Sequence, residues 1–182
     1  LEASLDQLEN DSLLKFVYED LQEEVLYWIQ DLPFEKFLND DVYFTHGTQH
    51  DDSKYLLEDV SSGQAVLRNE KEIIELIDDV ESKFVLCGHS SKARCINLGN
   101  GQVVINPGSV GLQAFKSTNP CLHSIENASP KASYIILDIN KNEYNISLHT
   151  VSYDYEKAIF EANKRDEKSW AYALKYAKLY NN

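Results

Sequence analysis

Two histidines stand at matching places in the sequence, each beside a glycine at the end of a short apolar run. His46 follows the run 41–45, and His89 follows the run 83–87. Neutral imidazole is a common ligand of zinc, manganese and iron. Either histidine alone would more often be structural, but a pair brought side by side would form a metal site.

The elements around these histidines predict that they meet. Both apolar runs read as β-strands, and residues 70–80 between them have the apolar spacing of a helix. A strand, a helix and a second strand predict two neighbouring parallel strands. Ligands bind beyond the carboxyl ends of such strands, so we expect His46 and His89 at one edge of a sheet. The adjacent glycines would allow sharp turns there.

The rest of the chain predicts an α/β (α+β) domain. Residues 13–29 have the pattern of one or two amphipathic helices, and Leu32-Pro33 ends that pattern. Two apolar segments flank Asn100-Gly101, which is a strong hairpin signal. Further strands are expected at 132–139 and 144–153, and a helical tail at 155–179. We expect a single domain over residues 1–182.

Composition narrows the classes of function. The 182 residues carry 43% hydrophobic and 26% charged side chains, as in an ordinary globular domain. No apolar run approaches the roughly 20 residues of a membrane span, and the first residues do not resemble a signal peptide. A cytoplasmic protein without a membrane partner is therefore expected. Cys87, Cys95 and Cys121 have no CxxC spacing, which argues against a disulfide framework or a cysteine zinc site.

The net charge of the chain limits the kinds of ligand that can be expected. The net charge of −13 repels a phosphate backbone, so we expect no nucleic-acid binding. A phosphorylated ligand would need a local positive centre, such as a metal ion or a helix N-terminus.

Three stretches together resemble the calcineurin-like metallophosphoesterase family. Residues 42–47 resemble its strand-His-Gly motif, residues 84–91 its strand-Gly-His-x-His motif, and residues 106–112, Asn-Pro-Gly-Ser-Val-Gly-Leu, its signature turn. Residues 128–134 and 151–154 are similar to the closing segments of the family. The order and spacing of these motifs carry the resemblance.

The resemblance implies a metallophosphoesterase β-sandwich with flanking helices and a two-metal site that hydrolyses a phosphomonoester or phosphodiester. In the family, the ligands come from Asp-x-His, Gly-Asp, Gly-Asn-His, His-Gly and Gly-His-x-His. His46 and His89 would bind the same divalent ion. Manganese is the first expectation, with iron, zinc, nickel or magnesium as alternatives. The implied partner is a small phosphorylated substrate.

The sequence departs from the family pattern in two ways. Ser91 stands where the second histidine of Gly-His-x-His belongs, and no Asp-x-His, Gly-Asp or Gly-Asn-His precedes His46. We therefore expect only a partial sandwich without its first strands, which alone neither binds its metals fully nor catalyses. The sheet edge or apolar face left open would favour a homo-oligomer.

Other interpretations stay open or are excluded. His50 and Arg94 are weaker candidates for substrate binding, with a solvated loop and a strand surface as the alternatives. Ser90 resembles the nucleophile of a serine hydrolase, but a strand rather than a helix follows it, which excludes that mechanism. A non-catalytic scaffold or binding protein with a decayed metal site is the serious alternative to an enzyme, and Ser91 favours it.

Overall fold

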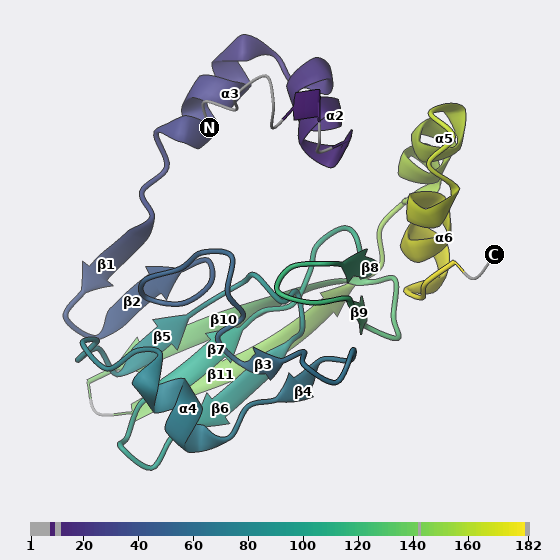
Figure 1. Cartoon of the computed structure of the whole chain (residues 1–182). Coiled ribbons are helices and arrows are strands. Elements are labelled where there is room, and N and C mark those ends of the chain that lie inside the picture. The colour runs from purple at the N-terminus through teal and green to yellow at the C-terminus, as the bar shows by residue number, and fades with distance from the viewer. Residues whose placement is uncertain (1–7, 10–11, 142, 181–182) are drawn as a thin grey trace. The chain divides into compact units, whose positions relative to one another are not determined.

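The structure of the chain is a computed structural model that describes residues 8–9, 12–141 and 143–180 (Figure 1). The chain forms two compact units, Leu1–Phe34 and Glu35–Asn182. The expectation of a single domain over residues 1–182 stays a prediction. All candidate site residues lie in the second unit.

The first unit is helical, as its sequence pattern predicts. Helix α2 (Ser12–Asp20) is followed by α3 (Glu23–Gln30). Glu23 and Glu24 lie in the first turn of α3, where acidic side chains interact favourably with the helix dipole. The helix ends before Pro33, as expected from the restriction that proline places on the residue before it.

The second unit is built on a five-stranded mixed sheet. Its strands lie in the order β1 (Glu35–Asn39), β2 (Val42–Thr45), β5 (Phe84–Leu86), β7 (Val103–Asn106) and β6 (Arg94–Asn97). The three central strands β2, β5 and β7 are parallel, and both edge strands are antiparallel. The predicted parallel pair and the predicted hairpin around Asn100-Gly101 are thus confirmed. Strand β1 was not predicted, because its five residues are all exposed and show no alternation.

Layers cover both faces of this sheet. Neighbouring residues of a strand point to opposite faces of the sheet. On one face, Tyr43, Val85 and Val104 pack in a cluster with Ile73 of helix α4 (Glu70–Glu75) and with Ile77, which follows the helix. The other face carries a second cluster, which includes Val42, Phe84, Val103 and Ile105 from the sheet and Ile135, Leu137 and Ile146 from the hairpin of β10 (Ala132–Asn140) and β11 (Glu143–Val151).

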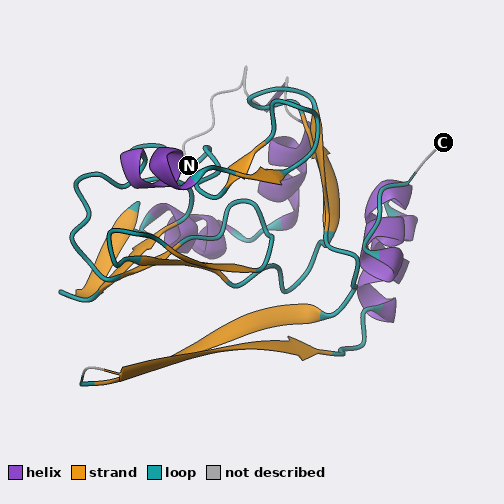
Figure 2. Cartoon of the chain, turned by 90° about the horizontal axis from the view of Figure 1, so that it is seen from below, coloured by secondary structure: helices purple, strands orange, loops and turns teal. Residues whose placement is uncertain are grey.

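Figure 2 shows this hairpin as a separate layer beneath the sheet. Burial of the central strands on both faces explains why they are continuous apolar runs. The α/β sandwich expected from the sequence is therefore confirmed. Helix α4 is shorter than the predicted segment 70–80 and ends at Glu75.

Smaller elements complete the second unit. Two short antiparallel pairs were not predicted, because strands of two to four residues have too little pattern: β3 (Glu58–Asp59) with β4 (Val66–Leu67), and β8 (Ala114–Ser117) with β9 (His123–Glu126). The helical tail consists of α5 (Glu156–Lys164) and α6 (Lys168–Tyr176). None of the helices in the described part of the chain combines the length and apolarity needed to cross a bilayer.

Candidate metal centre

The carboxyl ends of β2 and β5 bring His46 and His89 together. The parallel register pairs Phe44 with Leu86, so both chains leave the sheet at the same level. The backbone amides of Gly88 and His89 donate to the His46 carbonyl at 2.9 and 2.8 Å. Two hydrogen bonds on one carbonyl oxygen thus fasten the segments that carry the imidazoles.

The two imidazoles are in contact. Nε2 of His46 lies 3.0 Å from Nδ1 of His89, and the ring centroids are 4.9 Å apart. Two nitrogens bound at about 2.1 Å to one ion lie roughly 3.0–3.4 Å from each other at the usual ligand angles. The observed separation is that of a hydrogen bond between the two rings, and it also lies within this range for two ligands of one ion. The expectation that the rings arrive side by side is confirmed.

The surroundings of His89 favour its neutral form. Burial, and then the nearby His46, hold the pKa of His89 below its usual value, against smaller opposing effects of Ser53, Asp52 and Asp51. The Tyr55 ring stacks on His89 with centroids 4.6 Å apart. A neutral imidazole has the lone pair that a metal ion requires.

A second histidine fixes the position of Tyr55. Nδ1 of His123 lies 2.8 Å from the Cys121 carbonyl oxygen, which can only accept, so Nδ1 carries the proton. Nε2 of the same ring forms a hydrogen bond with the Tyr55 hydroxyl at 2.9 Å. His123 is buried and has a structural role here, because it orients the aromatic ring that packs against His89.

The loop that follows His46 is tightly folded. The Thr48 amide donates to the Asp51 carbonyl at 2.8 Å, and the Thr45 hydroxyl donates to the Thr48 carbonyl at 2.9 Å. A Cβ on Gly47 would lie 2.5 Å from the Asp51 carbonyl oxygen and 2.6 Å from that of Asp52. Only glycine fits at this position without a shift of the loop.

Comparisons with known proteins show the fold. No family model and no curated protein sequence matches this chain. Among solved structures, a metallophosphoesterase from Sphaerobacter thermophilus aligns with a TM-score of 0.65 and 16% sequence identity, over 90% of this chain and 67% of that one. The chain has the calcineurin-like metallophosphoesterase fold.

Two further structures align less well with the metallophosphoesterase fold of this chain. A Vps29 variant from Entamoeba histolytica has a TM-score of 0.42 at 15% identity, over 73% of this chain and 72% of that one. Vacuolar protein sorting 29 from Cryptosporidium parvum has a TM-score of 0.33 at 15% identity, over 67% and 58%.

His50 lies outside the contact between His46 and His89. Its ring nitrogen and carboxylate oxygens of Asp78 and Asp79 all lie within 4.8 Å of one another, and all three residues are exposed. This is the one group of three or more potential ligands among the described residues, and it contains neither His46 nor His89. The sequence analysis did not predict Asp78 and Asp79. Their adjacent carboxylates, which follow α4, were the one feature of the sequence that could have indicated this group.

Arg94 and Ser91 both make contacts that hold the fold. Nε of Arg94 donates to Oε1 of Glu58 at 2.6 Å, so this guanidinium is partly occupied by a structural ion pair. The Ser91 carbonyl accepts from the Asn127 side chain at 2.7 Å. The substrate-binding roles expected for Arg94 and His50 stay predictions.

Proposed function

We propose that His46 and His89 bind one divalent metal ion and that this ion belongs to a metal-dependent phosphoesterase centre. The observation that carries the proposal is the 3.0 Å contact between the imidazole nitrogens at the strand ends of a metallophosphoesterase fold. In such a centre, divalent ions polarise the phosphoryl oxygens and lower the pKa of a bound water. Manganese is the ion to test first, and the substrate would be a small phosphorylated molecule.

The chain itself supplies the orientation of two ligands. The hydrogen bonds to the His46 carbonyl fix the strand ends, and the Tyr55 ring covers one face of His89. Among the described residues, no group of three potential ligands includes either imidazole. Two neutral ligands do not make a two-metal site, so we expect the 182-residue chain by itself to bind one ion weakly and not to hydrolyse phosphoesters.

Manganese titrations followed by electron paramagnetic resonance test the metal site. We expect His46→Ala and His89→Ala to weaken binding at least about tenfold, because loss of a hydrogen-bond partner of a ligand already costs about that much. His149→Ala is the matched control, because His149 lies on β11 and stacks on Tyr134. Equal binding by the wild type and both alanine variants would overturn the assignment. His50→Ala reports separately on the exposed group of His50, Asp78 and Asp79.

Turnover of bis-p-nitrophenyl phosphate with manganese tests the catalytic part. No hydrolysis above background is the expected result for this chain. Hydrolysis that His46→Ala abolishes would show that the centre is complete, which would contradict the expected inactivity but support the phosphoesterase function.

A non-catalytic scaffold or binding protein is the second candidate. The observation in its favour is that Ser91, at the position of a metal-binding histidine in the family pattern, has a backbone role through Asn127. A chain that binds no manganese at His46 and His89 would support this candidate.

We also propose that the chain forms a homo-oligomer. Light scattering tests this proposal, and a stable monomer would contradict it.

A further inference from the structure

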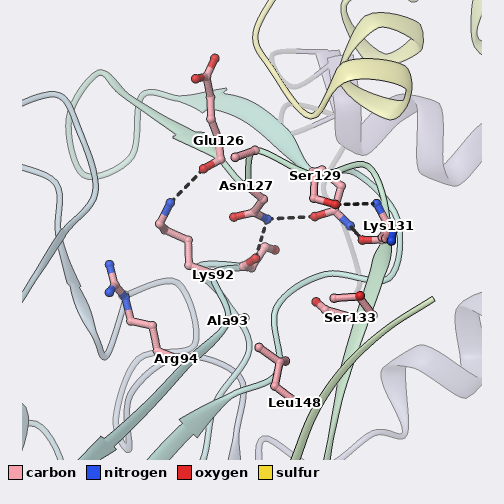
Figure 3. A pocket seen from close by; sticks show the side chains of 13 residues that line it. Lys92, Ala93, Arg94, Glu126, Asn127, Ser129, Lys131, Ser133 and Leu148 are labelled. Atoms are coloured by element: carbon pink, nitrogen blue, oxygen red, sulfur yellow. Dashed lines mark hydrogen bonds between the residues drawn. The ribbon is translucent and has the colours of Figure 1, made fainter. Parts of the chain in front are cut away.

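A separate pocket opens beyond the loop that carries His89. It has a volume of about 340 Å³ and lies between that loop, the turn after β9 and the β10–β11 hairpin (Figure 3). Neither His46 nor His89 lines it. Lys92, Arg94 and Lys131 are its cationic side chains, and serines and amides make up most of its polar lining. We call this site the basic pocket.

The cationic side chains of the basic pocket have N–H groups that can donate hydrogen bonds to a ligand. The Lys92 ammonium uses one proton to donate to the Glu126 carbonyl oxygen at 2.9 Å. Arg94 uses its Nε for Glu58, which leaves its two terminal NH₂ groups. The Lys131 ammonium makes no hydrogen bond or ion pair in the part of the chain that the structure describes. These groups can therefore bind a ligand without breaking an existing ion pair.

The acidic side chains near Lys92 offset its charge only in part. Glu126 is the one acid that lines the pocket, but its Oε1 accepts from the Leu179 amide at 2.8 Å. Figure 3 shows the Glu126 carboxylate directed away from Asn127 and Ser133, while its backbone carbonyl holds Lys92. Glu58 is fully buried and forms its ion pair with Arg94.

The electrostatics of Lys92 agree with this arrangement. Partial burial, and then the neighbouring Arg94, lower the pKa of Lys92, against smaller opposing effects of Glu58 and Glu126. An ammonium whose pKa is lowered in this way lacks a sufficient counter-charge, and a bound anion would provide one. The pocket is thus a local positive site on a chain whose net charge is −13.

We propose that the basic pocket binds an oxyanion with more than one negative charge, of which phosphate is the simplest, as part of a small molecule. Lys92 and Arg94 on one side of the pocket and Lys131 on the other would attract it, and charge-assisted hydrogen bonds from those cations that reach it would hold it (Figure 3). A small ligand is favoured over a nucleic acid because the acidic remainder of the molecule repels an extended phosphate backbone. The site works without a metal ion and so does not depend on the proposed phosphoesterase function.

Isothermal titration calorimetry with inorganic phosphate and with pyrophosphate, in the presence of EDTA, tests this proposal. We expect saturable binding to the wild type, tighter for pyrophosphate. Lys92→Gln and Lys131→Gln should each weaken it about fivefold or more, since each removes a charge-assisted bond. Lys71→Gln is the control, because it makes the same change of charge on a side chain that is 87% exposed and lies outside the pocket. It should change the affinity less than twofold.

Three results would overturn the basic pocket as the binding site. They are no saturable binding by the wild type, an equal loss in all three glutamine variants, and a loss in His46→Ala with none in Lys92→Gln and Lys131→Gln. Lys131 is exposed, so Lys131→Gln remains informative even if Lys92→Gln lowers the stability of the fold. Because EDTA removes metal ions and no turnover is measured, failure of the phosphoesterase proposal would leave this result unaffected.

Discussion

Nε of Arg94 lies 2.6 Å from Oε1 of Glu58, whose side chain is fully buried, while the Arg94 side chain is 23% exposed. The second carboxylate oxygen of Glu58 is buried and has no hydrogen-bond partner among the described residues. The buried charge on β3 therefore depends on one cation from the edge strand β6. This pair fixes the β3–β4 hairpin to the sheet and also positions Arg94 at the basic pocket.

Removal of Arg94 should destabilise the fold strongly. We expect Arg94→Leu to lower the free energy of unfolding by about 3–5 kcal/mol, because it leaves a buried carboxylate without its partner. The double variant Glu58→Leu/Arg94→Leu should recover most of this loss, since it removes both charges together. Urea denaturation followed by circular dichroism measures both. A double variant as unstable as Arg94→Leu would show that the ion pair is not the cause.

The contact between His46 and His89 could be predicted from the sequence because it depends on two strands and a connecting helix, each of which has its own local pattern. The apolar runs of β2 and β5 are buried on both faces, and the chain between them has room for one crossover helix. Two adjacent parallel strands must then end at one edge. The contact between the His46 and His89 rings is thus a consequence of the strand topology.

Contacts between distant segments could not be predicted in the same way. Glu58 is 36 residues from Arg94, and β3 is too short to show a pattern. The ion pair therefore left no signal in the sequence, which predicts Arg94 as a weak candidate for substrate binding or as a strand-surface charge. The stacking of Tyr55 on His89 and its bond to His123, 68 residues away, were missed for the same reason.

The two glycines beside the histidines should differ in their tolerance of alanine. A Cβ on Gly47 would lie within 2.7 Å of three backbone carbonyl oxygens, which cannot move without opening the loop. A Cβ on Gly88 would meet its nearest described neighbour, Nδ1 of His46, at an ordinary 3.8 Å. We therefore expect Gly47→Ala to destabilise the protein by about 1–3 kcal/mol, as overpacking does, and Gly88→Ala to change stability little.

Thermal denaturation of both variants measures this difference, and manganese binding shows whether the loop still presents His46. Gly88→Ala is the matched control, because it adds the same methyl group on the other histidine-bearing segment. Equal stability of the two variants would mean that the loop after His46 can relax around a side chain. The tight loop would then not be what holds that imidazole in place.

The thiols of Cys87 and Cys95 should react at different rates. Cys87 is buried at the end of β5, and burial, followed by the nearby Glu58, raises its pKa. Cys95 is exposed on β6, so a reagent can reach it, although partial burial raises the pKa of its thiol as well. Since the thiolate is the reactive form and must be accessible, we expect a disulfide reagent such as DTNB to modify Cys95 quickly and Cys87 only after unfolding. Cys95→Ser should remove the fast phase, and its persistence in that variant would contradict the prediction.

Stability should fall at alkaline pH because two buried tyrosines resist ionisation. Burial, and then the hydrogen bond of its hydroxyl to Glu35 at 2.6 Å, raise the pKa of Tyr43; burial, and then Glu58, raise that of Tyr55. Their folded-state pKa values exceed the unfolded value near 10, so this stability is fully present below about pH 10 and is lost as the pH rises above it.

Between the unfolded and folded pKa values, each such tyrosine should lower the free energy of unfolding by about 1.4 kcal/mol per pH unit, because the folded state holds a proton that the unfolded state has released. Tyr43→Phe removes one of these protons and should reduce the slope above pH 10 by that amount. Urea denaturation at a series of pH values from 8 to about 11.5 measures the slope. If Tyr43→Phe and the wild type lose stability in parallel, the Tyr43 hydroxyl does not contribute to the alkaline transition.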